Sequence, residues 1–115
     1  MVLVTVLSVV VGLLFLTTGG VKIVGLRQSL EIRDHFGMSP GLWRIIGALE
    51  CCGALGVLAG LAVKPLGVAA AAGLIAPMLG AIASRLRVRD PLRLIAFDVT
   101  VLVLVAITFA VRIAT

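Results

Sequence analysis

Four long apolar segments restrict what this sequence can fold into. They cover residues 2–21, 42–62, 66–84 and 94–111, and most charged residues lie between them. A helix of roughly 20 apolar residues crosses the hydrocarbon core of a bilayer. Only helices and closed barrels satisfy every backbone hydrogen bond in lipid, and barrel strands are alternating runs of about 10 residues. The sequence therefore predicts an all-α, integral membrane four-helix bundle, with residues 1–115 as one domain.

The composition excludes a domain that is soluble in water. Hydrophobic residues make up 62% of the chain and charged residues only 13%, whereas soluble domains carry about 25% charged residues. The lipid bilayer is therefore the expected surrounding of the helices. The first apolar segment has no basic region before it and exceeds the apolar length of about 7–15 residues that is usual in signal peptides, so we expect it to be a mature helix.

The links between the segments predict how the helices are connected. The links after the second and third segments are short, so neighbouring spans are expected to be antiparallel. Residues 22–41 form the longest link and carry charges of both signs. Within this link, residues 29–35 are predicted to form a short interfacial helix. Gly37 and Pro40 would end it, because Gly favours a helix C-terminus and Pro disfavours helix before it.

Basic residues lie mainly near one end of the predicted bundle. Eight of the 10 Lys and Arg residues lie in or beside the first and third links: Lys22, Arg27, Arg33, Arg44, Arg85, Arg87, Arg89 and Arg93. Loops rich in Lys and Arg stay in the cytoplasm, so both termini are predicted to be extracytoplasmic. Because this charge lies beside span ends, it favours anionic lipid headgroups over nucleic acid.

Small residues predict close helix packing. Glycines and one acid recur at steps of three or four residues in the second span: Gly47, Glu50, Gly53, Gly56 and Gly60. Such spacing places them on one helical face, where small residues let helices approach closely in lipid. Gly73 belongs to a similar face of the third span, and Pro77 is expected to kink that helix. The same faces could pack within one bundle or between two copies, so a homo-oligomer stays an open alternative.

Two acidic residues lie inside predicted spans. Glu50 and Asp98 would each cost roughly 2.5–3.5 kcal/mol in lipid if they were unpaired. Lys22, Arg44 and Arg85 lie near the same end of the bundle, so these five residues are predicted to form an intramembrane polar cluster. Two interpretations stay open. The cluster either fixes the register of the helices or lines a cytoplasm-facing pocket that binds or protonates a small molecule.

The remaining reactive residues give weaker indications. Cys51 and Cys52 are adjacent in the second span, which disfavours a disulfide between them and does not match zinc-ligand spacing, so buried free thiols are expected. His35 is the single histidine and is expected to be interfacial. The sequence shows no metal-ligand motif and no catalytic motif, and catalytic activity of the chain alone is not expected.

Several short motifs occur in an order that resembles a known family. Residues 17–22 end the first span as TTGGVK, residues 35–40 read HFGMSP, residues 46–56 read IGALECCGALG, and residues 71–74 read AAGL. This order resembles the DoxX-like family of small bacterial four-helix membrane proteins. Lys22, Gly47 and Glu50 match the polar signature of that family. Arg85 falls where the family often has a basic residue, and no role is carried over for Asp98.

The resemblance implies a multi-pass protein of the bacterial cytoplasmic (inner) membrane. It further implies a membrane subunit or accessory protein of a redox system, with a membrane or soluble oxidoreductase as partner and quinone as the candidate ligand. Two alternatives stay open. One is a protein or enzyme that binds a small molecule or lipid through Glu50 and Asp98. The other, ranked last, is a proton-coupled transporter of the small multidrug type, because the first span here carries no acid.

Overall fold

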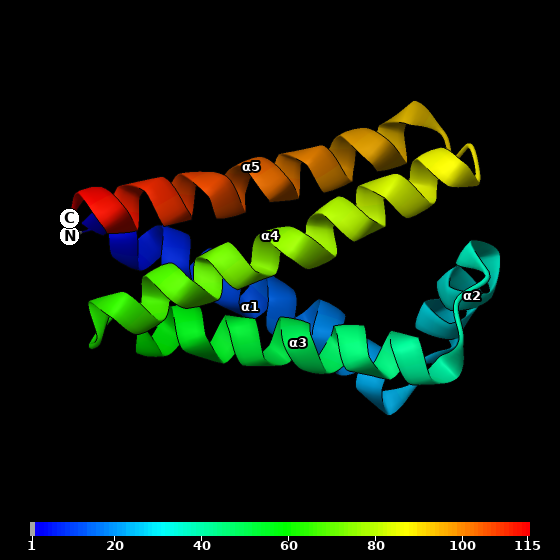
Figure 1. Cartoon of the computed structure of the whole chain (residues 1–115), viewed down its shortest axis with the longest axis horizontal. Coiled ribbons are helices and arrows are strands. Elements are labelled where there is room, and N and C mark those ends of the chain that lie inside the picture. The colour runs from blue at the N-terminus through cyan, green and yellow to red at the C-terminus, as the bar shows by residue number, and fades with distance from the viewer. Residues whose placement is uncertain (1) are drawn as a thin grey trace.

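The computed structural model describes residues 2–115 and contains only helices and their links within that range. The helices are α1 (Val2–Val24), α2 (Arg27–Phe36), α3 (Pro40–Ala59), α4 (Lys64–Arg87) and α5 (Leu92–Ala114). All except α2 are long and apolar enough to cross a bilayer. Consecutive spans run antiparallel, and the two termini lie at the end of the bundle opposite to α2 (Figure 1). The predicted all-α membrane bundle is therefore confirmed.

The link between α1 and α3 contains the short helix α2. This helix covers Arg27–Phe36, three residues more than residues 29–35, the range expected from the sequence. Gly37 ends it with a φ of 70°, a left-handed conformation that favours glycine. Ser39 then begins α3, because its hydroxyl accepts a hydrogen bond of 3.2 Å from the backbone N–H of Leu42, and Pro40 occupies the first turn.

The second span ends earlier than expected. The sequence predicted helix to residue 62, but α3 ends at Ala59. Residues 60–62 form a tight turn instead, in which the backbone N–H groups of Leu61 and Ala62 bond to carbonyl groups three residues earlier. The first span is longer than expected and includes Lys22, so this basic side chain belongs to a transmembrane helix.

An apolar core joins the four long helices. Its buried members come from each of them: Val11, Phe15, Ala54, Val57, Ala71, Leu74, Met78, Val101 and Val105. The outer surface of the spans is also apolar, with Leu13 58%, Leu55 57% and Leu79 54% exposed. An apolar outer surface of this extent suits lipid as solvent and would be unfavourable in water.

Glycines let α3 approach both of its neighbours closely. A Cβ atom on Gly60 would lie 2.2 Å from the Cα atom of Gly67 in α4, so only glycine fits there. A Cβ atom on Gly47 would lie 2.8 Å from the carbonyl oxygen of Gly19 in α1. Close approach of this kind replaces side-chain burial as the source of van der Waals contact in lipid.

The glycines that the sequence placed on one face of the second span therefore contact two helices rather than one. Gly53 and Gly56 face Leu74 and Ala70 of α4, as Gly60 faces Gly67, whereas Gly47 faces α1. Gly73 does not pack against another helix of the same chain: this glycine is exposed, and no atom lies within 4 Å of the place where its Cβ would be. Gly73 lies one position before Leu74, and a step of one residue turns a helix by about 100°, which points it away from α3.

Candidate functional site

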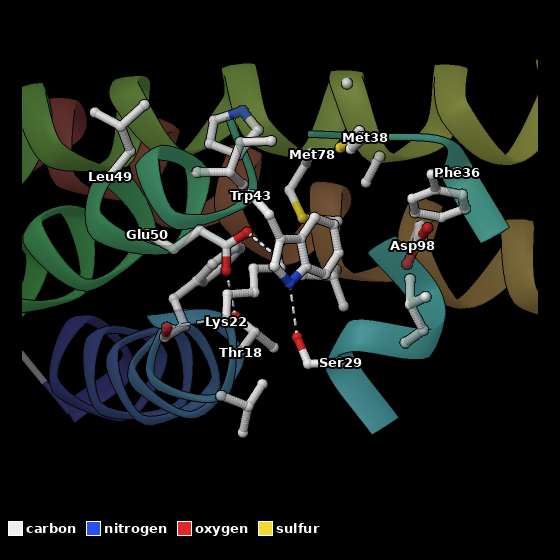
Figure 2. A pocket seen from close by; sticks show the side chains of 18 of the residues that line it. Thr18, Lys22, Ser29, Phe36, Met38, Trp43, Leu49, Glu50, Met78 and Asp98 are labelled. Carbon is white, nitrogen blue, oxygen red and sulfur yellow. Dashed lines mark hydrogen bonds and ion pairs between the residues drawn. The ribbon is translucent and has the colours of Figure 1, made fainter. Parts of the chain in front are cut away.

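A cavity of about 560 Å³ lies at the end of the bundle where α2 is found, which we call the α2 end. Residues of all five helices line it, and α3 and α4 diverge toward this end (Figure 1). The wall is mostly apolar and includes the aromatic rings of Phe15, Phe36 and Trp43. Figure 2 shows Glu50, Lys22 and Asp98 among the side chains that surround it. Both acids that the sequence placed in the membrane thus border one cavity.

Glu50 of α3 is held by two residues of α1. Its Oε1 atom forms an ion pair with Lys22 Nζ, and its Oε2 atom accepts a hydrogen bond of 2.7 Å from the Thr18 hydroxyl. Thr18 and Lys22 share one face of α1 because they are four residues apart. Only 4% of the Glu50 side chain is exposed, so these two contacts replace the hydration that a carboxylate has in water.

Lys22 also contacts an aromatic ring. Its Nζ atom lies 5.0 Å from the centroid of the Trp43 ring, within the range of a cation–π interaction. The Trp43 indole N–H in turn donates a hydrogen bond of 2.9 Å to Ser29 Oγ on α2. Figure 2 shows this chain of contacts from Glu50 through Lys22 and Trp43 to Ser29. Helices α1, α2 and α3 are therefore joined through the wall of the cavity.

Asp98 of α5 forms the second buried ion pair, with Arg85 of α4. The Nε atom of Arg85 binds Asp98 Oδ2, and its Nη1 atom lies 3.0 Å from Oδ2 of Asp90 in the link between α4 and α5. The two carboxyl groups use different edges of the guanidinium, which is the fork geometry that suits arginine to such sites. Arg85 therefore joins the cavity to the link outside the membrane spans.

Asp90 has a second partner on α2. His35 Nε2 lies 2.5 Å from Asp90 Oδ1. The hydrogen bond with His35, more than that with Arg85, lowers the pKa of the Asp90 carboxyl, and together they outweigh the opposing effect of burial. Asp90 is thus held ionised between an imidazole and a guanidinium.

Four of the five predicted cluster residues line this cavity: Lys22, Glu50, Arg85 and Asp98. They form two separate ion pairs rather than one network. The expectation that Arg44 joins them is wrong, because its side chain is exposed and does not line the cavity. Arg44 precedes Glu50 by six residues, which at about 100° per residue places the two side chains on different faces of α3.

Several site residues were not identified from the sequence: Thr18, Ser29, Trp43 and Asp90. Thr18 could have been found, because it lies one helical turn before Lys22 on the same face. The contacts of Trp43 with Ser29 and of Asp90 with His35 depend on how α2 folds back over the bundle, and no local sequence pattern carries that information.

The cysteines differ from each other in environment. Both are free thiols; Cys51 is half-buried beside Gly19, whereas Cys52 is exposed on the outer surface of α3. The expectation that both are buried is therefore wrong for Cys52, because adjacent residues point about 100° apart on a helix. Among residues 2–115, no group of three His, Cys, Asp or Glu side chains could hold a metal ion.

Comparison with known proteins agrees with the motifs and the fold. Residues 6–108 match the model of the DoxX-like family. We found no match among curated proteins or among solved structures. The family match includes most of each of the four transmembrane helices and most of the chain. The chain therefore belongs to the DoxX-like family.

Proposed function

We propose that this protein binds a neutral, mostly apolar small molecule with a polar head in the cavity at the α2 end. The observation that carries the proposal is that one cavity of about 560 Å³ is lined by both buried ion pairs and is otherwise mostly apolar. An apolar cavity with a few fixed polar groups is the usual form of a small-molecule site. The apolar wall would hold the body of the ligand, and the ion pairs would orient its head.

The charge balance of the cavity favours a neutral head group. Lys22 and Arg85 contribute two positive charges, and Glu50 and Asp98 contribute two negative charges. A charged ligand would add an unbalanced charge beside these two ion pairs. In a medium of low dielectric constant, a buried charge without a partner is unfavourable. A carbonyl or hydroxyl group can instead accept a hydrogen bond from Lys22 or Arg85, and a hydroxyl group can also donate one to Glu50, without displacing either pair.

The exposed residues of the cavity wall point to the lipid phase as the source of the ligand. Leu49 of α3 and Phe97 of α5 line the cavity, yet they are 57% and 59% exposed on the apolar outer surface. Beyond the contact between Gly53 and Leu74, α3 and α4 separate toward the α2 end (Figure 1). A molecule dissolved in the bilayer would therefore reach the cavity sideways, without crossing the charged ends of the helices.

A quinone is the proposed ligand class. Quinones dissolve in lipid, their rings are neutral, and their carbonyl groups accept hydrogen bonds. Trp43, Phe36 and Phe15 provide aromatic surfaces for such a ring. Quinone binding would fit a role as membrane subunit or accessory protein of an oxidoreductase in the bacterial inner membrane, with the α2 end in the cytoplasm as the positive-inside rule favours.

A second candidate function uses the two carboxyl groups as an acid and a base. Glu50 and Asp98 face one cavity from α3 and α5 and have different partners, so each could take a separate role in a reaction. In that case the ligand would be isomerised or hydrolysed rather than only bound. Conversion of a bound lipid-soluble substrate by the wild type, lost in both Glu50→Gln and Asp98→Asn, would favour this candidate.

Trp43 offers a direct test of binding, because it is the only tryptophan of the chain and lines the cavity. We expect a short-chain quinone to quench its fluorescence in a saturable manner when the protein is held in lipid nanodiscs. Gly80→Leu should weaken binding about tenfold, or about 1.4 kcal/mol, because the new side chain would occupy part of the cavity.

Gly73→Leu is the matched control. Both glycines lie in α4, and neither has an atom within 4 Å of the position of a Cβ, but only Gly80 lines the cavity. The control should therefore keep the affinity of the wild type. Quenching that rises linearly with quinone concentration, or that is equal in the two variants, would show that the quinone dissolves in lipid and does not occupy the cavity.

A further inference from the structure

Helix α2 covers the α2 end of the cavity as a separate element. Its residues Ser29, Ile32 and Phe36 line the cavity from that side. Two glycines with positive φ angles flank the helix, Gly25 at 81° and Gly37 at 70°. Glycine moves between backbone conformations more easily than other residues, so both links can act as hinges.

The contacts of α2 with the α4–α5 side of the cavity come from two neighbouring residues at its C-terminal end. His35 Nε2 lies 2.5 Å from Asp90 Oδ1. The backbone carbonyl of Phe36 accepts a hydrogen bond from Arg87, and the Arg85 guanidinium lies 5.4 Å from the centroid of the Phe36 ring. Because these contacts sit at one end of a short helix, their loss would free α2 from α4 and from the link between α4 and α5.

A second, smaller cavity lies outside the first and shares part of its wall. Its volume is about 290 Å³, and Glu31, His35 and Asp90 line it together with Arg85. Arg85 also lines the larger cavity, where it holds Asp98. The arginine thus stands between the two spaces, with Asp90 on its outer side and Asp98 on its inner side.

We propose that His35 and Asp90 form a proton-controlled latch that holds α2 over the cavity and positions Arg85 beside it. When His35 is protonated, its attraction to Asp90 closes the latch. When His35 loses the proton, that attraction weakens, α2 moves away from the α4–α5 link, and the outer cavity opens to water. The consequence for ligand binding rests on the proposed function, whereas the movement of α2 does not.

The charges around the latch identify His35 as the group that changes. An ordinary imidazole changes charge between pH 5 and 8, whereas ordinary carboxyl and guanidinium groups do not. The pKa of Asp90 is lowered by its hydrogen bond with His35, so this carboxyl stays ionised well below that range. The other charged groups that face the latch are Arg85 and Arg87 from α4 and Glu31 from α2, while α5 contributes the uncharged Leu94. Protonation of His35 therefore closes the latch, and loss of that proton opens it.

Spin labels can measure the position of α2 without any ligand. We would place them at the exposed positions Arg27 and Arg93, in a protein with Cys51→Ala and Cys52→Ala, in nanodiscs. We expect a short, narrow distance distribution at pH 5.5 and a longer, broader one at pH 8. His35→Gln should show the same distribution at both values, because glutamine can hydrogen-bond to Asp90 but does not titrate.

Asp34→Asn serves as the control for a neighbouring charge. Asp34 lies next to His35 but pairs with Arg33 on its own helix, so this variant should keep the pH dependence of the wild type. Distances that do not change between pH 5.5 and 8 in the wild type, or that change equally in His35→Gln, would overturn the latch.

Quinone titrations of Trp43 fluorescence at the same two pH values extend the test to the site. We expect the affinity to differ by at least about fivefold between them in the wild type, the lower end of typical coupling between sites. The difference should disappear in His35→Gln. Movement of α2 without saturable quinone binding would refute the proposed function and support the latch. Saturable quinone binding without movement of α2 would support the proposed function and refute the latch.

Discussion

The two ends of the bundle use the same helices in opposite ways. At the end with the termini, backbone meets backbone: Gly60 touches Gly67, and Arg112 donates a hydrogen bond to the carbonyl group of Gly60. At the α2 end, α3 and α4 carry Trp43 and Met78, and a cavity separates them. One end leaves no space for a side chain, and the other leaves space for a ligand.

This difference shows how a membrane protein can be stable and still enclose an apolar cavity. Lipid offers little hydrophobic driving force for helix association, so close packing of small residues must supply the stability. The glycine contacts provide it at the end with the termini. The ion pair of Lys22 with Glu50 ties α1 to α3, and that of Arg85 with Asp98 ties α4 to α5, which leaves the space between these two helix pairs open.

The largest effect is expected at the closed end. Gly60→Leu would place a side chain where the Cα atom of Gly67 lies 2.2 Å from the new Cβ, so α3 and α4 would have to move apart. We expect a loss of more than about 4 kcal/mol in the free energy of unfolding. The free energy of unfolding can be measured by circular dichroism during a titration with SDS.

Gly41→Leu provides a comparison at the other end of α3. No atom lies within 4 Å of the position of its Cβ, so this variant should unfold close to the wild type. Equal stability of Gly60→Leu and Gly41→Leu would contradict the view that the closed end holds the bundle together.

The next effect concerns the buried ion pair between α1 and α3. Glu50→Leu would leave Lys22, whose side chain is 17% exposed, without its carboxylate partner. We expect a loss of about 3–5 kcal/mol in the free energy of unfolding, as for other buried pairs that lose one partner. The same SDS titration applies.

The double variant Lys22→Met and Glu50→Leu separates pairing from burial. Because both charges are then absent, most of the lost stability should return. If the double variant is no more stable than Glu50→Leu alone, the unpaired charge of Lys22 is not what destabilises Glu50→Leu. Lys22 would then reach water at the α2 end.

A smaller effect is expected where α2 meets α3. Trp43→Phe keeps an aromatic ring in the wall but removes the indole N–H, whose bond to Ser29 is 2.9 Å long. The loss of one buried hydrogen bond should cost about 1 kcal/mol. Faster hydrogen exchange confined to α2 would locate the effect there, whereas equally faster exchange in α3 and α4 would mean that the ring packing was disturbed.

The sequence predicted the fold far better than the site. Long apolar runs are stable in lipid as helices, so the spans and the short helix between the first two of them followed from length and polarity. The acids Glu50 and Asp98 were recognised because a charge in lipid needs an explanation. Their partners were only partly recognised. Arg44 is close to Glu50 along the sequence, but the rotation of the helix over six residues places the two side chains on different faces of α3.

The contacts of α2 could not be predicted in this way. His35 meets Asp90 across 55 positions of sequence, and the pairing depends on the angle at which Gly25 and Gly37 turn the chain. Local sequence patterns predict that a polar helix forms between the first two spans. The direction in which this helix folds back depends on its packing against α3 and the α4–α5 link.

The smallest effect is expected for Arg44, and it separates surface charge from the cavity. Arg44 lies at the α2 end but is exposed and outside the cavity wall, so Arg44→Gln should change the free energy of unfolding by less than about 0.5 kcal/mol. Arg85→Gln has the same change in charge but removes the ion-pair partner of Asp98, and should cost about 3 kcal/mol or more. SDS titrations of the two variants, with quinone affinity measured in parallel, compare them directly. If Arg44→Gln weakens quinone binding as much as Arg85→Gln does, the basic residues act through the total charge of the α2 end, and the ion pairs in the cavity have no special part.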